Sequence, residues 1–481
     1  MSTESLARWQ FAITTVYHYL IVPMTIGLSV LVAAFQTAHY RTGKPEWDAA
    51  ARFYGKLMIV SFTLGVATGI VQEFQFGMNW SDYSRFVGDV FGAPLAMEAL
   101  VAFFLESTFL GLWVFGRDRL SPRQHLAAIW LLASGTVASA YFILAANSWM
   151  QHPVGWAFDP VSGRAELTSI WAVLTNITQL VTFPHTVLAA FMTGGGVVLG
   201  ISAWHLRRGV TSHPDGPMHL RMHRATLRAS AAVVLVAGIG VSAVGHLQGQ
   251  VMTDQQPMKM AAAEALFETR SRAPFSLFTI GNEKDLSSRF EVSIPYGLSL
   301  LAENDPKAEV LGIRDLQADS ESRFGEGDYV PSIWLAYWAF RLMIGLGVVS
   351  MLLATVVLWR QRRGRNLGDG RLLKIAGWAA LLPFAANAAG WIFTETARQP
   401  WLVYGVLKTE DGLSPGVSTT EVASTLIGST LLYAGLGFIA VRIFLKISRQ
   451  GPITPASDAD PWLAPADHPH DQGTPEPALI D

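Results

Sequence analysis

The sequence contains no cysteine. This absence excludes disulfide bonds, iron–sulfur clusters, thiolate-ligated or covalently attached c-type haem, and cysteine nucleophiles. A metal bound by this chain would therefore have to be held by His, Met, Glu or Asp side chains.

Charged residues are also scarce. They make up 15% of the 481 residues, against about 25% in typical soluble domains. Hydrophobic residues make up 51%, and the net charge of −2 argues against a nucleic-acid partner. The 16 Trp, 26 Phe and 11 Tyr suit interfacial anchors and the walls of a large planar ligand site. This composition indicates that lipid is the solvent for most of the chain.

Nine apolar stretches are long enough to cross a bilayer core about 30 Å thick, which takes about 20 residues of helix. The first begins too close to the N-terminus and runs too long to be a cleaved signal peptide. The sequence thus predicts an all-α, polytopic membrane protein with about nine transmembrane helices. The nine stretches are 11–36, 53–76, 93–115, 126–147, 180–204, 227–246, 333–359, 372–395 and 425–446.

The distribution of Lys and Arg predicts the orientation. Alternate loops, counted from the one after the first span, together with the segment after the ninth, carry 21 of the 35 basic residues. The N-terminus and the remaining loops carry 13, and eight of these lie in one long loop, which has little weight in the positive-inside rule. We therefore expect the N-terminus outside and the C-terminus in the cytoplasm.

The spans divide the chain into four parts. Residues 1–246 hold six spans and residues 333–446 hold three. The long extracytoplasmic loop between them, 247–332, includes a helix-like run and is expected to be ordered and functional, because long loops in compact proteins usually are. The tail 447–481 is acidic and rich in proline, and we predict that it is disordered in the cytoplasm.

Four potential iron ligands fall in the spans near the outer face: His18, His185, Met343 and Glu395. A charge within a span costs at least about 2.5–3.5 kcal/mol on insertion scales, so such residues are functional candidates. Taken alone, His18 is better explained as a buried side chain bonded to a neighbouring helix. Taken alone, Met343 is an ordinary core filler. Their common depth is what favours a shared ligand.

Three arginines, Arg8, Arg341 and Arg398, are expected near the same face. Haem is the ligand class that needs axial His or Met together with cationic partners for its propionates. A copper or zinc site without haem would need a tighter cluster of histidines, which the sequence does not provide. The set of residues therefore favours haem.

Glu98 and Glu106 lie eight residues apart in the third predicted span. In a regular helix this spacing separates them by about 12 Å along the axis and about 80° around it, so that they share a broad face. Such a pair predicts a ladder for protons, and the alternative is two neutral carboxyls held by interhelical hydrogen bonds. Lys259 and Glu264 in the long loop are five residues apart, and spacing alone suggests only a solvated face.

Several motifs resemble subunit I of the cytochrome bd type quinol oxidases, the terminal respiratory oxidases of bacteria and archaea. The resemblance extends from about Leu6 to Lys446 and matches the form with a short quinol loop. The motifs are RWQFAITTVYHYLIVPMTIGL around His18, APLAMEALVAFFLEST with Glu98 and Glu106, NSWMQHPVG from Asn147, FPHT around His185, KMAAAEALFET from Lys259, WAFRLM ending at Met343, and GWIFTETARQPW from Gly390.

This resemblance implies two haem b groups and one haem d, with haem b as the alternative to haem d at the oxygen site. His185 and Met343 would be the axial pair of a low-spin haem b. His18 would hold the haem d iron, with Glu98 nearby. Glu395 would hold the high-spin haem b iron, with Trp391 and Arg398 beside it.

The resemblance also implies a function. Lys259 and Glu264 correspond to residues of the family's quinol loop. This correspondence replaces the interpretation of the two residues as part of a solvated face. Quinol, either menaquinol or ubiquinol, would be oxidised outside, and O2 would be reduced to water with protons that pass Glu106 and Glu98 from the cytoplasm. The expected location is the bacterial inner (plasma) membrane. The expected partners are a homologous second membrane subunit and, where present, small accessory single-span subunits.

Two other functions are compatible with the residues alone. A proton-coupled transporter would use Glu98 and Glu106 to bind its coupling ion and would contain no haem. A dihaem quinol dehydrogenase would pass electrons to a partner without oxygen chemistry. Carbon monoxide binding would separate the dehydrogenase from an oxidase.

Overall fold

The computed structural model describes residues 2–209, 216–282, 286–362, 370–378 and 380–451. Nine helical segments in these ranges are long and apolar enough to cross a membrane, which confirms the predicted spans. They are α1 (Thr3–Thr42), α2 (Pro45–Met78), a third span made of α3 (Ser81–Met97), η1 (Glu98–Phe103) and α4 (Phe104–Phe115), α5 (Pro122–Gln151), α7 (Ile177–Arg208), α8 (Gly216–Gln255), α12 (Ile333–Arg362), an eighth span made of α13 (Gly370–Trp378) and α14 (Leu381–Thr396), and α15 (Thr419–Gln450).

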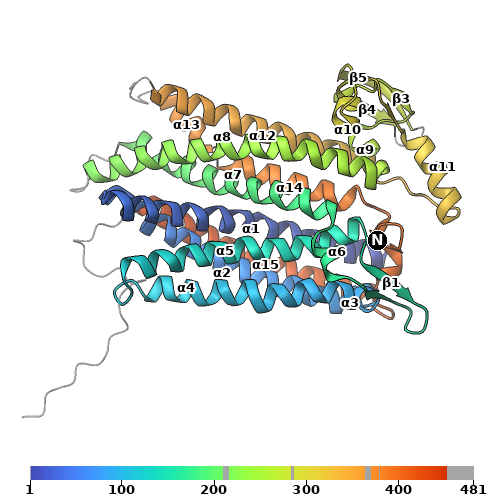
Figure 1. The fold of residues 1–481 in the computed structure, drawn as a ribbon, viewed down its shortest axis with the longest axis horizontal. Helices are drawn as coiled ribbons and strands as arrows, with labels where there is room; N and C mark the ends of the chain where they lie inside the picture. Colours follow the sequence, from blue (N-terminus) through green and yellow to red (C-terminus); the bar gives the residue numbers. More distant parts are fainter. Residues whose placement is uncertain (1, 210–215, 283–285, 363–369, 379, 452–481) are drawn as a thin grey trace, which may run out of the picture.

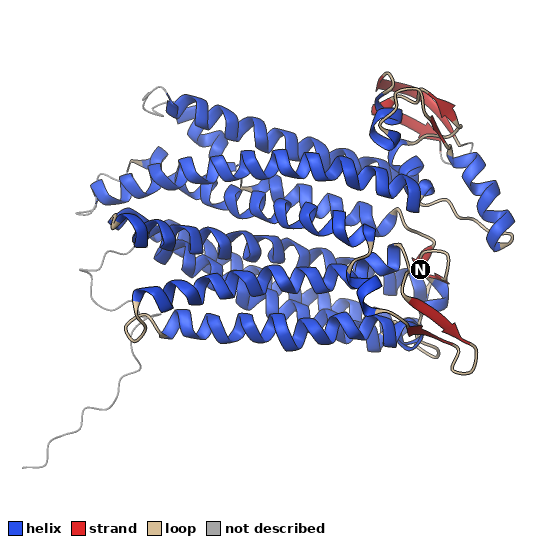
Figure 2. Ribbon diagram, in the orientation of Figure 1, coloured by secondary structure: helices blue, strands red, loops and turns tan. Residues whose placement is uncertain are grey.

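The shorter elements gather at one end of the bundle (Figures 1 and 2). The described strands form only two-stranded antiparallel pairs: β1 with β2, β3 with β6, β4 with β5, and β7 with β8. These elements are β1 (Trp156–Asp159), β2 (Arg164–Leu167), α6 (Ile170–Leu174), α9 (Pro257–Glu264), β3 (Arg270–Ser271), β4 (Phe275–Asn282), β5 (Ser287–Ile294), α10 (Gly297–Glu303), β6 (Glu309–Val310), α11 (Ile313–Phe324), β7 (Trp401–Val403), β8 (Leu407–Lys408) and η2 (Glu410–Gly412).

The N-terminus lies at the same end as the elements of the long loop (Figure 1). The predicted topology also puts the N-terminus and the long loop on the same side of the membrane, because six spans, an even number, separate them. Which side of the membrane this end faces stays a prediction from the Lys and Arg distribution. We call it the outer end below.

Helix α1 is the centre of the bundle and packs against α2, α5, α7, α14 and α15. It approaches α7 closely, and a Cβ added at Gly194 would lie 2.7 Å from the Cα of Gly27. Small residues let two membrane helices approach this closely, and van der Waals packing then holds them. This central position fixes the residues of α1 relative to five other helices.

Local sequence signals set the start of several helices. Ser121 and Ser418 form capping boxes with Gln124 and Glu421 at the beginnings of α5 and α15, so the first free N–H groups are satisfied. At the other end, α15 continues to Gln450. The predicted tail therefore begins about four residues too early, and its remainder, 452–481, lies outside the described residues.

Two spans depart from regular helix. The third contains a π-helical segment over Glu98–Phe103, so the angle that we derived for Glu98 and Glu106 from regular helix geometry does not apply. π-Helical turns within α-helices are frequent at functional sites. The eighth span is divided into α13 and α14, and the sixth runs nine residues past its predicted end, to Gln255.

Candidate functional site

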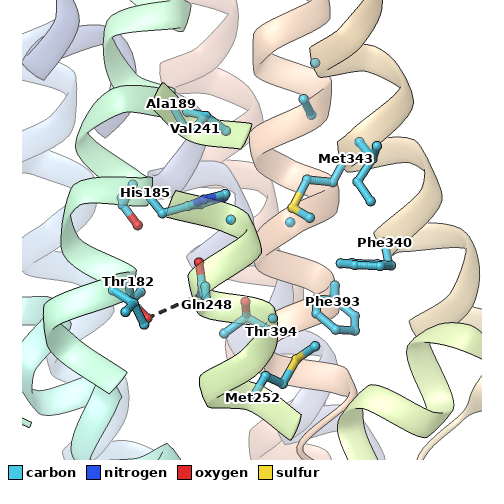
Figure 3. Close-up of a pocket in the computed structure, with 18 of the residues that line it drawn as sticks. Thr182, His185, Ala189, Val241, Gln248, Met252, Phe340, Met343, Phe393 and Thr394 are labelled. Carbon is cyan, nitrogen blue, oxygen red and sulfur yellow. Dashed lines mark hydrogen bonds between the residues drawn. The ribbon is translucent and has the colours of Figure 1, made fainter. Parts of the chain in front are cut away.

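A cavity of about 370 Å³ lies in the outer half of the bundle between α7, α8, α12 and α14. Its walls are mostly apolar, as is usual for cofactor and small-molecule sites. His185 of α7 and Met343 of α12 extend toward one another from opposite walls (Figure 3). The structure thus brings these two predicted ligands to one space.

Glycines on the facing helices make room for both side chains. A Cβ at Gly390 of α14 would lie 2.8 Å from the sulfur of Met343, and a Cβ at Gly245 of α8 would lie 3.2 Å from Cε1 of His185. A Cβ contact of 2.8 Å is shorter than real side chains show, so a larger residue at Gly390 would displace the thioether. Gly390 and Gly245 thus leave the space that the side chains of Met343 and His185 occupy.

Glu395 lies at the outer end of α14 in a network of hydrogen bonds. Its Oε2 accepts from Nη2 of Arg398 at 2.7 Å, and its Oε1 accepts from Nδ2 of Asn147 at 2.9 Å. The Arg398 side chain is only 1% exposed, and its Nε and Nη1 have no partner among the described residues. Buried donors of this kind are costly unless a ligand satisfies them. They suit an anionic group such as a propionate.

Trp391 lies one turn before Glu395 and also lines the cavity. Its ring stacks on Tyr19 at 4.8 Å between centroids, and its buried Nε1 has no partner among the described residues. Because Tyr19 adjoins His18 in the chain, this contact ties the outer part of α1 to α14. The common depth predicted from sequence for these residues agrees with this contact.

His18 points from α1 toward α2. Its Nδ1 lies 2.9 Å from Oγ1 of Thr68, and the Thr68 hydroxyl is already within hydrogen-bond distance of the Leu64 carbonyl as a donor. When the Thr68 hydroxyl donates to that carbonyl, it accepts from Nδ1–H of His18, and in that tautomer Nε2 keeps its lone pair. A hydrogen bond of this type orients metal-ligating histidines. In that tautomer Nε2 has the lone pair that a metal ligand needs.

The two predicted proton carriers occupy different surroundings. Oε1 of Glu98 accepts a hydrogen bond from Oγ of Ser139 at 2.8 Å, at the start of the π-helical segment. Glu106 is 7% exposed and lies against Gly135 of α5, where an added Cβ would be 2.8 Å from Cγ of Glu106. Both carboxyls therefore face α5 rather than lipid.

Lys259 is buried at 4% exposure in α9 and lines the same cavity as His185. Its Nζ donates to Oε1 of Gln151 at 2.8 Å and to the carbonyl of Thr394 at 3.1 Å. Burial, together with the nearby charge of Arg398, lowers the pKa of Lys259 to about 7.

Gln151 and Asn147 connect Lys259 to Glu395. Nε2 of Gln151 donates to Oδ1 of Asn147 at 2.8 Å, and Asn147 in turn donates to Glu395. Sequence reasoning placed both amides in a family motif but gave them no role. Their spacing of four residues, which puts them on one helix face, was the available signal.

Glu264 closes α9 and is also buried, at 4% exposure. Its Oε2 accepts from Nη2 of Arg341 at 2.7 Å and from the amide of Ser276 at 3.1 Å. Burial raises the pKa of Glu264 to about 7 against the opposing effect of Arg341. The rings of Tyr337 and Phe275 flank the Arg341 guanidinium at 4.4 and 4.7 Å, so the pair is held firmly.

Two arginines that we predicted beside a cofactor have other surroundings. Arg341 is engaged with Glu264 and does not line the cavity. Arg8 lies near the N-terminus, where its half-exposed side chain pairs with Glu4 at 3.4 Å. Of the three predicted arginines, the structure brings only Arg398 to the network around Glu395.

Comparisons with known proteins agree with the sequence resemblance. A family model described as cytochrome bd terminal oxidase subunit I matches residues 6–452. The chain is 42% identical over 452 residues to cytochrome bd ubiquinol oxidase subunit 1 of Bacillus subtilis (strain 168), with 94% of each chain covered. It is 36% identical to cytochrome bd-II ubiquinol oxidase subunit 1 of Escherichia coli (strain K12), with 93% of this chain and 96% of that one covered.

The fold is also similar to a solved structure. The bd oxidase from Geobacillus thermodenitrificans matches with a TM-score of 0.84 and 28% identity, covering 94% of this chain and 99% of that chain. The similarity therefore includes the long loop as well as the spans.

Proposed function

Because this chain belongs to the family of cytochrome bd terminal oxidase subunit I, we propose that it oxidises membrane quinol at its outer end and passes the electrons to oxygen. The observation that carries this proposal is one cavity that extends from the His185 and Met343 pair to Lys259. A single space thus offers a site for an electron carrier and a basic group for a quinol oxygen. A multi-pass membrane location follows from the nine spans.

We propose that this chain holds three haems. His185 and Met343 would hold a low-spin haem b, His18 the haem d, and Glu395 a high-spin haem b with Trp391 alongside. The unpartnered Nε and Nη1 of Arg398 fit a propionate. Haem bound in these pockets supplies the one-electron carriers and the iron at which oxygen is reduced. Haem b in place of haem d is the alternative at His18.

Lys259 and Glu264 would handle the quinol. Quinol oxidation releases two electrons and two protons, so the site needs a group that binds a quinol oxygen and a base that takes the protons. Lys259 can donate from the cavity wall to the quinol oxygen, and Glu264 at the end of the same helix can accept a proton. Arg341 keeps Glu264 in place, which is a positioning role.

Water formation consumes four protons for each O2. We propose that they come from the cytoplasm past Glu106 and then Glu98, whose carboxyls both face α5. Quinol protons leave on the outside, so the opposite origins of the two sets of protons generate a proton motive force without a pump. The complex would contain a second membrane subunit in a bacterial inner membrane, with menaquinol or ubiquinol as donor.

A visible spectrum tests this function. The purified complex, reduced with dithionite and compared with the air-oxidised form, should show low-spin haem b bands and a far-red band that shifts with carbon monoxide. It should also consume oxygen when quinol is added. Haem b bands that are insensitive to carbon monoxide would favour a dihaem dehydrogenase, and a correctly folded sample without haem would favour a transporter.

The two buried groups of α9 predict the pH dependence of quinol oxidation. Glu264, with a pKa of about 7, accepts protons only when ionised, so kcat/KM should fall below pH 7. Lys259, also with a pKa of about 7, loses its charge above that pH, so kcat/KM should fall there too. We expect a bell-shaped profile centred near pH 7, measured as oxygen uptake at varied quinol concentration.

Variants assign the two limbs of this profile. Glu264→Gln should turn over slowly, and its kcat/KM should no longer fall below pH 7. Lys259→Arg should keep its charge at high pH, so its kcat/KM should no longer fall above pH 7. Oxygen uptake driven by an artificial one-electron donor that bypasses the quinol site should keep its own pH profile in both variants. An acid limb that persists in Glu264→Gln would show that another group is the base.

A further inference from the structure

Half of the Glu264 carboxylate has no partner. Arg341 and Ser276 both bond Oε2, while Oε1 is buried and has no hydrogen-bond partner among the described residues. A buried carboxylate oxygen without a donor is costly, and such atoms usually have a functional explanation. The Glu264 side chain is only 1% exposed, so bulk water does not reach it directly.

Glu264 lines a second cavity, of about 190 Å³. Lys259 of α9 lines the larger cavity and Glu264 of the same helix lines the second, so one short helix borders both. A polar space of this size has room for several waters. The second cavity therefore reaches the buried Glu264 side chain.

The β4–β5 pair forms another wall of this cavity and carries Glu291 into it. Ser276, whose amide holds Glu264, is paired with Ser293 across the two strands. Residues two apart in a strand share a face, so Glu291 lies on the same face as Ser293. A bulge after Ser276 keeps Thr279, the partner of Glu291, buried on that face as well.

Glu291 is exposed, so the cavity joins a buried carboxylate to the outer surface. Two further charged residues line it, Glu268 and Arg270. Glu268 is already paired with Arg314 at 3.6 Å, whereas no ion pair occupies Glu291 among the described contacts. Glu291 is therefore the better placed acceptor of a proton from Glu264.

We propose that the second cavity is the outlet for quinol protons and that Glu291 is the group that accepts them from Glu264. This proposal rests on the proposed quinol oxidation. For each proton, the O–H bond of the Glu264 carboxyl breaks and an O–H bond forms on Glu291, directly or through water in the cavity. Glu264 is then an ionised base again and can take the second proton of the same quinol. Electrons leave by the other cavity, toward His185.

The charges around Glu264 support this direction of transfer. Arg341 favours its ionised form, while the charge of Glu291 favours its protonated form. When Glu291 takes the proton, that repulsion disappears and Glu264 is restored to its ionised form. Glu268 and Arg270 at the rim offset one another in charge. Each transfer to Glu291 therefore returns Glu264 to the ionised form that accepts the next proton.

The test uses the complete oxidase, with its partner subunit, in proteoliposomes. Glu291→Gln should lower kcat for quinol on the order of tenfold, as expected for loss of a proton acceptor, with KM unchanged. Glu303→Gln is the matched control, because Glu303 of α10 is exposed and does not line the cavity. Added acetate should restore kcat in Glu291→Gln and have no effect in the control, since this small carboxylate fits the cavity.

The outcomes separate the outlet from the function on which it rests. If Glu264→Gln loses quinol turnover but Glu291→Gln behaves like Glu303→Gln, the outlet is wrong and the quinol site stands. If Glu264→Gln itself keeps full turnover, Glu264 is not the base and the proposed quinol site is wrong. A raised KM with unchanged kcat in Glu291→Gln would instead indicate a binding role and overturn the outlet.

Discussion

Replacement of His185 by Ala should reduce quinol-driven oxygen uptake at least about a hundredfold, because even groups that only support a metal ligand are worth 10–100-fold. His185 and Met343 face one another across the main cavity, and His246, which also lines it, is engaged through Nε2 with Oδ1 of Asn304 at 2.7 Å. Removal of the imidazole should therefore remove the low-spin haem b bands. The measurement is oxygen uptake together with the reduced minus oxidised spectrum.

Met343→Leu tests the opposite side of the same pocket. Leucine conserves the volume of methionine but cannot bind iron, so the bands should change from low-spin to high-spin while the haem stays bound. Met351→Leu is the matched control, because Met351 lines the same cavity on the same helix but does not face His185 in the described contacts. Unchanged low-spin bands in Met343→Leu would remove the thioether from the ligand set.

The spans were predictable because lipid demands long apolar helices. All nine predicted stretches fall within helices that could cross a membrane. Most predictions were short at one or both ends, since the helices continue on polar residues that hydropathy does not count. The sixth shows this most clearly, where α8 runs on to Gln255 and brings that end of the helix beside the cavity.

The π-helical segment was not predictable in the same way. It begins at Glu98, and nothing in the surrounding apolar run distinguishes it from regular helix. The segment packs against α5, and Ser139 of α5 donates a hydrogen bond to Glu98. The spacing of apolar residues reports only local helix preference. The π-helical segment also contacts a residue 41 positions away in the sequence, which this spacing does not reveal.

The sequence named candidate site residues, but it did not predict which of them form hydrogen bonds or ion pairs with one another. Depth along the spans predicted Arg341 near the outer face, but a depth argument cannot say which anion it meets. The structure gives it Glu264, which lies 77 residues away in the sequence. In the same way Lys259 reaches Gln151 across 108 residues, and only the folded chain shows that contact. Long-range polar pairs are what the sequence alone could not specify.

Glu106→Gln should slow oxygen reduction on the order of a hundredfold while leaving the haem spectrum intact, because the amide keeps the shape of the carboxyl but cannot carry a proton. Glu106 lies deeper than Glu98 along the third span, so protons from the cytoplasm reach its level first. The measurement is steady-state oxygen uptake by the complex in proteoliposomes. Ser107→Ala is the matched control, since Oγ of Ser107 bonds the carbonyl of Phe104 on its own helix and the residue is exposed.

A second measurement distinguishes a proton path from a structural defect in Glu106→Gln. Without oxygen, electrons from quinol should still enter the complex at the normal rate, because quinol oxidation releases protons outside and needs none from the cytoplasm. Only the steps that form water should be slow. If anaerobic reduction is slowed equally, or if the haem bands are lost, Glu106 supports the fold and carries no protons. If turnover is unchanged, the proposed path past Glu106 to Glu98 is wrong, and another route must supply the protons for water.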